Sequence, residues 1–180
     1  MTEAPTRPIR TVPGRTCGSC SLCCKLMNVP ELDKPMGQWC RHCKPGTGCT
    51  IHATRPQVCR DFFCGYLQSS TLSQDWLPAK AHFIVTGDPS GIVLYVDPAN
   101  PDAWKASPFY ERIKMWAVEG VPRNRLVTVR VGRRTIAVMP DNDFDLGEMD
   151  PGDTIEWEAR RGPIGRVYSA RKVKAKAAKA

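Results

Sequence analysis

The hydrophobic pattern separates a regular C-terminal region from an irregular N-terminal one. Apolar, β-branched runs at 82–87 (HFIVTG) and 91–98 (GIVLYVDP) predict two buried strands, and the segment 88–91 (DPSG) predicts the turn between them. Residues 107–120 (SPFYERIKMWAVEG) place Phe109, Ile113, Trp116 and Ala117 at helical spacing, with Ser107 as the cap before the helix. This helix is expected to pack on the sheet.

Two further hairpins follow the helix. Segment 125–140 (RLVTVRVGRRTIAVMP) alternates valines on one face, turns at Gly132 and returns. Segment 153–173 (DTIEWEARRGPIGRVYSARKV) places Ile155 and Trp157 on one face and glutamates on the other. The predicted fold class is α+β, with a cysteine-rich metal-binding lobe of short helices and loops beside a small antiparallel β-sheet with one helix. The predicted parts are a flexible N-terminal arm (1–16), the cysteine-rich lobe (17–70), the α+β region (71–170) and a basic disordered tail (171–180).

All nine cysteines lie between Cys17 and Cys64. The N-terminus lacks the apolar run of a secretory signal, and no membrane span is recognised, so we expect a cytoplasmic protein whose thiols are reduced. Disulfides are disfavoured by that compartment, by the odd count and by the adjacent pair Cys23 and Cys24. Core filling accounts for one or two cysteines but not for repeated C-x2-C spacing. Metal ligation is the remaining interpretation.

The segment 17–24 (CGSCSLCC) offers two local geometries. On a helix, Cys17, Cys20 and Cys24 fall within an arc of about 60°, and Cys23 widens it to about 120°. If Gly18 instead forms a turn, Cys17 and Cys20 become paired ligands of a loop, and Cys23 or Cys24 joins them from the next helical turn. Both zinc sites and iron–sulfur clusters use such spacing.

A second set of ligand residues occupies 39–64. The Pro/Gly-rich loop after Cys40 and Cys43 can return Cys49 to the same ion, and His52 would complete a site of three thiolates and one imidazole. His42 and His52 can equally be surface residues or partners of the ligands. Thr54 and Gln57 predict a capping box at the start of a helix that carries Cys59, and Phe62 and Phe63 would cover the site.

These motifs, C17-G-S-C20-S-L-C23-C24, then Cys40, G48-C49-T-I-H52 and R55-P56-Q-V-C59-R60-D-F62, resemble the CxxCxxCC (YkgJ-type) cysteine-cluster family, described as zinc- or iron-chelating. The similarity covers about residues 17–64. It implies that Cys17, Cys20, Cys23, Cys24, Cys40, Cys49 and Cys59 are the shared metal ligands, whereas Cys43 and Cys64 are additions of a subgroup. Family members commonly carry tyrosine at the position of His52. Flagellin lysine N-methylases share the motif, which implies an iron–sulfur cluster linked to methyl transfer.

The leading functional hypothesis is a cytoplasmic metal-binding protein with a structural, sensing or metal-handling role. Its cofactor would be a [4Fe-4S] cluster or Zn²⁺ in one or two sites, with iron favoured by the spacing and by the methylase kinship. The alternatives are an iron–sulfur enzyme similar to protein lysine methylases and a zinc-stapled nucleic-acid-binding module. The predicted metal ligands are Cys17, Cys20, Cys23, Cys24, Cys40, Cys43, Cys49 and Cys59, with Cys64 and His52 as additional candidates.

Charge and the remaining motifs add little. The formal net charge is +8, and five of the basic residues lie in 171–180. Two four-thiolate metal sites would lower the net charge to about +4. The tail can be a solvated end or can contact nucleic acid. No phosphate-binding loop, nucleophile elbow or paired catalytic carboxylates are recognised, so no catalytic residue is predicted.

Overall fold

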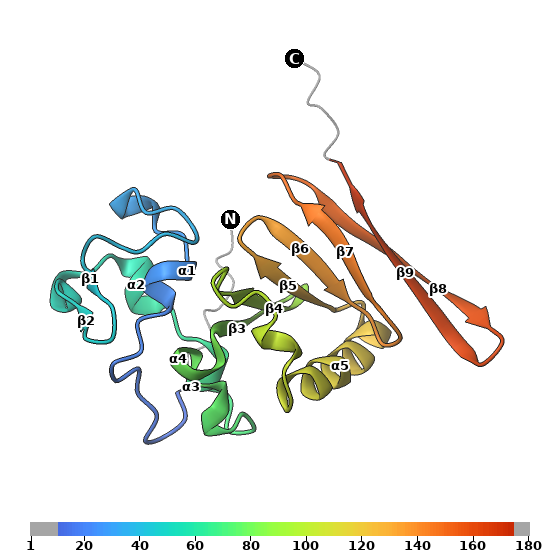
Figure 1. The fold of residues 1–180 in the computed structure, drawn as a ribbon, viewed down its shortest axis with the longest axis horizontal. Helices are drawn as coiled ribbons and strands as arrows, with labels where there is room; N and C mark the ends of the chain where they lie inside the picture. The colour runs from blue at the N-terminus through green and yellow to red at the C-terminus, as the bar shows by residue number, and fades with distance from the viewer. Residues whose placement is uncertain (1–10, 175–180) are drawn as a thin grey trace, which may run out of the picture. The chain divides into compact units, whose positions relative to one another are not determined.

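The computed structural model describes residues 11–174 and divides the chain into two compact units, Met1–Ala81 and His82–Ala180 (Figure 1). The unit boundary lies after Ala81, eleven residues beyond the predicted end of the cysteine-rich lobe at residue 70. Both helices and strands are present, and the predicted α+β class is confirmed. Among the described residues, no helix is both long enough and apolar enough to cross a membrane.

The first unit consists of short elements joined by turns. In chain order these are α1 (Cys23–Leu26), η1 (Pro30–Leu32), β1 (Cys43–Lys44), β2 (Gly48–Cys49), η2 (His52–Thr54), α2 (Gln57–Asp61), α3 (Gly65–Gln68), η3 (Gln74–Trp76) and α4 (Pro78–Ala81). None exceeds five residues, so packing and side-chain bonds, rather than helix length, must stabilise them.

The end of the first unit has a small apolar core. Tyr66, Leu67, Leu72 and Trp76 are buried there. The guanidinium of Arg15 donates hydrogen bonds to the carbonyls of Tyr66, Ser69 and Leu72 at 2.6, 2.7 and 2.6 Å, and lies over the Tyr66 ring. The predicted flexible arm 1–16 is therefore anchored at Arg15, and residues 1–10 lie outside the described part of the chain.

The second unit is built on a five-stranded sheet in the order β3-β4-β5-β6-β7. The strands are β3 (Phe83–Asp88), β4 (Gly91–Val96), β5 (Leu126–Val131), β6 (Arg134–Val138) and β7 (Asp143–Glu148). The two predicted strand pairs, β3–β4 and β5–β6, both form with turns at the expected residues. In the turn between β3 and β4, Asp88 Oδ1 accepts hydrogen bonds from the backbone N–H groups of Ser90 and Gly91. The core includes Phe83, Ile84, Leu94 and Val129, each fully buried.

The sheet is mixed, which corrects the prediction of a purely antiparallel sheet. Strands β4 and β5 run parallel because the chain between them crosses over through η4 (Ala103–Lys105), α5 (Phe109–Gly120) and η5 (Val121–Arg123). At the start of this parallel pair the backbones approach so closely that a Cβ on Gly91 would lie 1.8 Å from the Leu126 carbonyl oxygen.

Helix α5 forms where its spacing predicts. Ile113 and Ala117 are buried, and Phe109 meets Phe83 edge to face at 5.0 Å between ring centroids. The predicted Ser107 cap is wrong, because the helix begins at Phe109 after Pro108 and no side chain caps it. Tyr110 OH instead donates to Asp143 Oδ2 at 2.8 Å, which ties the helix to β7.

Strands β8 (Thr154–Gly162) and β9 (Gly165–Val173) form a long separate hairpin. Its burial alternates as predicted, with Ile155 and Trp157 half-buried and Glu156 and Glu158 exposed. The predicted disordered tail 171–180 is corrected in its first part, because β9 continues to Val173; residues 175–180 lie outside the described residues. A hollow of about 640 Å³ runs along the hairpin, and its lining contains no cysteine.

Candidate metal centre

The first four cysteines adopt the turn geometry rather than one continuous helix. Gly18 has φ +52°, a left-handed conformation that suits glycine, and Cys20 N–H donates to the Cys17 carbonyl at 2.9 Å. Helix α1 begins only at Cys23. The turn at Gly18 therefore separates the Cys17/Cys20 pair from the Cys23/Cys24 pair.

The second C-x2-C segment leads into a small hairpin. Cys43 N–H donates to the Cys40 carbonyl at 2.9 Å, and Cys43 in β1 pairs directly with Cys49 in β2. Directly opposed residues in an antiparallel pair project to the same face. A hydrogen bond of 2.9 Å from Cys40 N–H to the Cys24 carbonyl joins this hairpin segment to α1.

Cys59 lies in the five-residue helix α2, as predicted, but the helix start differs. No side chain caps α2, so the predicted Thr54–Gln57 capping box is absent. Gln57 Nε2 instead donates to Asp61 Oδ1 at 2.7 Å. Phe62 and Phe63, predicted to cover the site, are half-buried.

All nine cysteines are free, and two groups of neighbouring thiols can be distinguished. In the larger group the Cys24 side chain hydrogen-bonds with those of Cys23 and Cys43. The Cys59 thiol interacts with Cys24, Cys40 and Cys49. We call this set the six-thiol group; its members are Cys23, Cys24, Cys40, Cys43, Cys49 and Cys59.

Burial and neighbouring thiols oppose ionisation of three members of the six-thiol group, Cys24, Cys43 and Cys59. The hydrogen bond with Cys23, followed by burial, raises the pKa of Cys24 far above that of an ordinary thiol. Burial and then the neighbouring Cys24 raise the pKa of Cys43 to about 11, and the pKa of Cys59 is raised by burial and the same neighbour. Several thiolates cannot coexist here without a compensating cation, and a metal ion, if bound, would supply that charge.

Lys34 is a cationic side chain that interacts with these thiols. It is only 5% exposed, and its Nζ donates to the carbonyls of Lys25, at 2.7 Å, and Met27. Burial lowers the Lys34 pKa, while Cys24, Cys40, Cys23 and Cys59 act in the opposite direction. The sequence does not point to Lys34, because a lysine before proline in a loop carries no distinguishing signal.

The second set, which we call the three-thiol group, contains Cys17, Cys20 and Cys64. Burial raises the pKa of the Cys17 thiol, with further contributions from Cys64 and Cys20, and Arg55 opposes the rise. Cys64 is buried directly before α3, where backbone N–H groups of Leu67 and Tyr66 offset part of its raised pKa. Cys64 thus lies beside the first C-x2-C pair.

Among the described residues, no contact places His52, the predicted histidine ligand, beside either thiol group. His52 lies on η2 with an exposed side chain, and His42 is half-buried. The carbonyl of His42 accepts hydrogen bonds from the N–H and hydroxyl of Thr50.

The thiols are neighbours without forming a finished coordination sphere. Across residues 11–174, no group of three or more His, Cys, Asp or Glu side chains is arranged so that it could hold a metal ion. The chemistry of the donors nevertheless fits zinc or iron, because both groups consist of free thiols.

Comparisons with known proteins found no matching family model, no similar curated protein and no similar solved structure. The resemblance to the CxxCxxCC family therefore stays a prediction that rests on cysteine spacing.

Proposed function

We propose that this protein is a cytoplasmic metal-binding protein whose cysteine-rich region holds Zn²⁺ or an iron–sulfur cluster in a structural, sensing or metal-handling role. The six-thiol group carries the proposal. Each of six thiols from α1, β1, β2, α2 and the loop before β1 interacts with at least one other thiol of the group, and none is oxidised to a disulfide. Clustered free thiols destabilise one another as thiolates unless a metal compensates their charge.

Each part of the chain would have a defined task in this function. Cys24, Cys43 and Cys59 would supply ligands, because each of these thiols interacts with at least two others of the six-thiol group. Lys34 would offset part of the negative charge of the thiolates from its buried position. Bound metal would supply the folding free energy of the loops, and an iron–sulfur cluster would also allow electron transfer.

The three-thiol group is proposed as a second, weaker site or as a source of one remote ligand. It offers three sulfurs, whereas a structural zinc site uses four ligands. Cys24 is also among the neighbours that raise the Cys17 pKa, so the two groups are close enough to interact.

The test is site-resolved protection of thiols. Reduced apoprotein is reconstituted anaerobically, either with Zn²⁺ or with Fe²⁺ and sulfide, then alkylated, and each cysteine is read by mass spectrometry. We expect members of the six-thiol group to be protected together, and Cys24→Ser to abolish that protection. The matched control Cys64→Ser should leave the six-thiol group protected. Equal alkylation of all nine cysteines with and without metal would refute the proposal.

A further inference from the structure

We propose that the β8–β9 hairpin is an arm that binds a groove of double-stranded DNA. This inference is independent of the metal function and concerns the second unit alone. Its evidence is the anchoring of the hairpin at its root, the exposure of its free end and the placing of arginines on one face.

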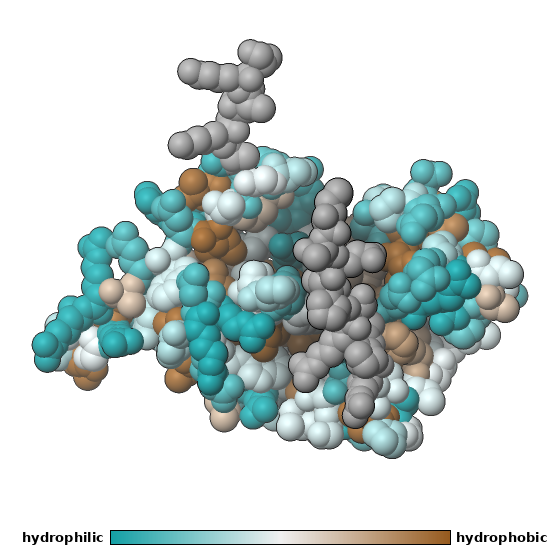
Figure 2. Space-filling model, turned by 180° about the vertical axis from the view of Figure 1, so that it is seen from behind, coloured by the Kyte–Doolittle hydropathy of each residue, from teal (hydrophilic) through white to brown (hydrophobic). Residues whose placement is uncertain are grey.

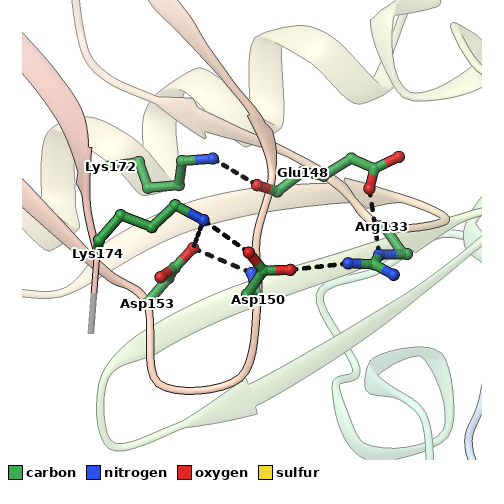
Figure 3. Close-up of polar contacts among 6 residues, drawn as sticks. All are labelled: Arg133, Glu148, Asp150, Asp153, Lys172 and Lys174. Atoms are coloured by element: carbon green, nitrogen blue, oxygen red, sulfur yellow. Dashed lines mark hydrogen bonds and ion pairs between the residues drawn. The ribbon is translucent and has the colours of Figure 1, made fainter. Parts of the chain in front are cut away.

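The root of the hairpin is fixed to the rest of the second unit by polar contacts (Figure 3). Lys174 pairs with Asp150 at 2.6 Å, and Asp150 also pairs with Arg133 at 2.8 Å. Farther along β8 toward the turn, Trp157 Nε1 donates a hydrogen bond to Asn124 Oδ1 at 3.2 Å. These pairs are solvent-exposed and individually weak, but together they orient the arm.

The free end of the arm, residues 159–167, is exposed to solvent. Every one of these residues is exposed except the half-buried Gly162, and Ile164 in the turn is 102% exposed. Figure 1 shows the turn between β8 and β9 projecting beyond the five-stranded sheet, and Figure 2 shows this projection as mainly hydrophilic with small hydrophobic patches. Strands β8 and β9 are nine residues long each, and their free end extends beyond the five-stranded sheet. Packing within the second unit therefore does not require strands of this length.

Arginines at the free end are placed in a way that opposes folding. Arg161 and Arg166 are direct cross-strand partners, and like charges in that position destabilise a sheet. Within residues 11–174 neither makes an ion pair with a carboxylate. On the opposite face, Arg160 and Arg171 do pair, with Glu158 at 2.8 Å and Glu156 at 2.6 Å.

At the free end, the face that carries Arg161 and Arg166 is therefore uncompensated and positive. Alternation along the strands also gives this face Ile155, Trp157, Ala159, Tyr168, Ala170 and Lys172, and no acidic residue. Of these six, only Ala159 is exposed, so the open part of the face lies at the free end. Two uncompensated arginines beside an apolar turn, Pro163–Ile164, match what a protein presents to a nucleic acid, namely cations for phosphates and an apolar wedge for base steps.

Groove dimensions favour duplex DNA over duplex RNA. The major groove of B-form DNA, about 12 Å wide, admits a two-stranded β-ribbon. The major groove of A-form RNA is too narrow for side chains to read. A lipid surface would suit the apolar turn but does not require two arginines facing each other across one ribbon.

The experiment measures binding of the full-length, metal-loaded protein to a short DNA duplex by fluorescence anisotropy at several salt concentrations. Each phosphate contact contributes about 0.9 to the slope of log affinity against log salt. The variant R161Q/R166Q should thus lower the magnitude of the slope by about 1.8. Between about 50 and 200 mM salt, the fold loss of affinity should therefore be about 12 times smaller for this variant than for the unmodified protein. The matched control R160Q/R171Q removes the same charge from the paired face and should retain the slope.

The outcomes separate the alternatives. Equal loss in both double variants would overturn the proposal, because binding would then follow net charge alone. Stronger binding of an RNA duplex or of phosphatidylserine vesicles would overturn it in favour of those partners, as would complete loss on deletion of residues 175–180. Ile164→Ser should weaken binding without changing the salt slope, and an unchanged affinity would exclude insertion of the turn. Circular dichroism of each variant verifies that the sheet is intact.

Discussion

Removal of metal should unfold residues 17–64 and leave the sheet β3–β7 folded. The perturbation is chelation of the holoprotein under reducing conditions, so that no disulfide can replace the metal. In residues 17–64 only three aliphatic side chains are buried, those of Leu22, Leu26 and Val29. The second unit, in contrast, buries strand residues on four adjacent strands and two residues of α5.

Under the proposed function, bound metal would be the largest stabilising contribution to this region. Burial of three aliphatic side chains contributes about 5–9 kcal/mol. A structural zinc site contributes about 10–16 kcal/mol of apparent binding free energy at neutral pH. Loss of the metal therefore removes more than the hydrophobic burial of the same residues provides.

Amide hydrogen exchange with and without chelator is the assay. Amides in 17–64 should lose protection, including Cys40 N–H and Cys43 N–H, whose hydrogen bonds join α1 to the small hairpin. Amides in β3–β6 should keep theirs and serve as the internal control. Equal protection of residues 17–64 in both states would refute the reasoning.

Three further predictions concern the two units separately. Gly91→Ala should destabilise the second unit by about 3 kcal/mol or more in urea unfolding, because its Cβ would collide with Leu126. Gly132→Ala, which has φ +61° but open space, should cost only about 1–2 kcal/mol, and equal losses would contradict the close approach of β4 and β5. Burial and the bond to Asp143 raise the pKa of Tyr110 to about 12. Tyr110 thus keeps its proton to a higher pH in the folded state than in the unfolded state. Its contribution to the free energy of unfolding should be fully present below about pH 10 and decrease as pH rises toward about 12. Tyr110→Phe should remove that part of the decline, and an unchanged decline would exclude Tyr110 as its source. Because the pKa values of Cys24, Cys43 and Cys59 are raised, metal binding should release protons and strengthen as pH rises, measured by titration calorimetry in buffers of different ionisation enthalpy. No proton release would show that these thiols are not ligands.

The strands and helix of the second unit were predictable because hydrophobic periodicity is a local property of the sequence. The alternation in β5 and β6 and the spacing of Ile113 and Ala117 in α5 both follow from it. The parallel pairing of β4 with β5 was not predicted, since it depends on how α5 crosses the sheet rather than on the strands themselves.

The cysteine region was predictable in composition but not in arrangement. Spacing alone places Cys43 and Cys49 near each other, because a tight Pro/Gly loop joins them. It cannot show that Cys64 lies beside Cys17 or that Lys34 is buried among thiols, because both result from long-range packing. The opposed Arg161 and Arg166, in contrast, could have been foreseen from their symmetric positions about the turn Pro163–Ile164.

Metal content after anaerobic purification tests the central claim most directly. The protein, purified without chelators, is assayed for zinc, iron and acid-labile sulfide, and its visible spectrum is recorded. The proposal predicts stoichiometric bound metal, with iron, sulfide and a visible chromophore that Cys59→Ser diminishes for a cluster, or a colourless zinc protein for a structural site. Folded, metal-free protein with nine thiols open to titration would contradict it.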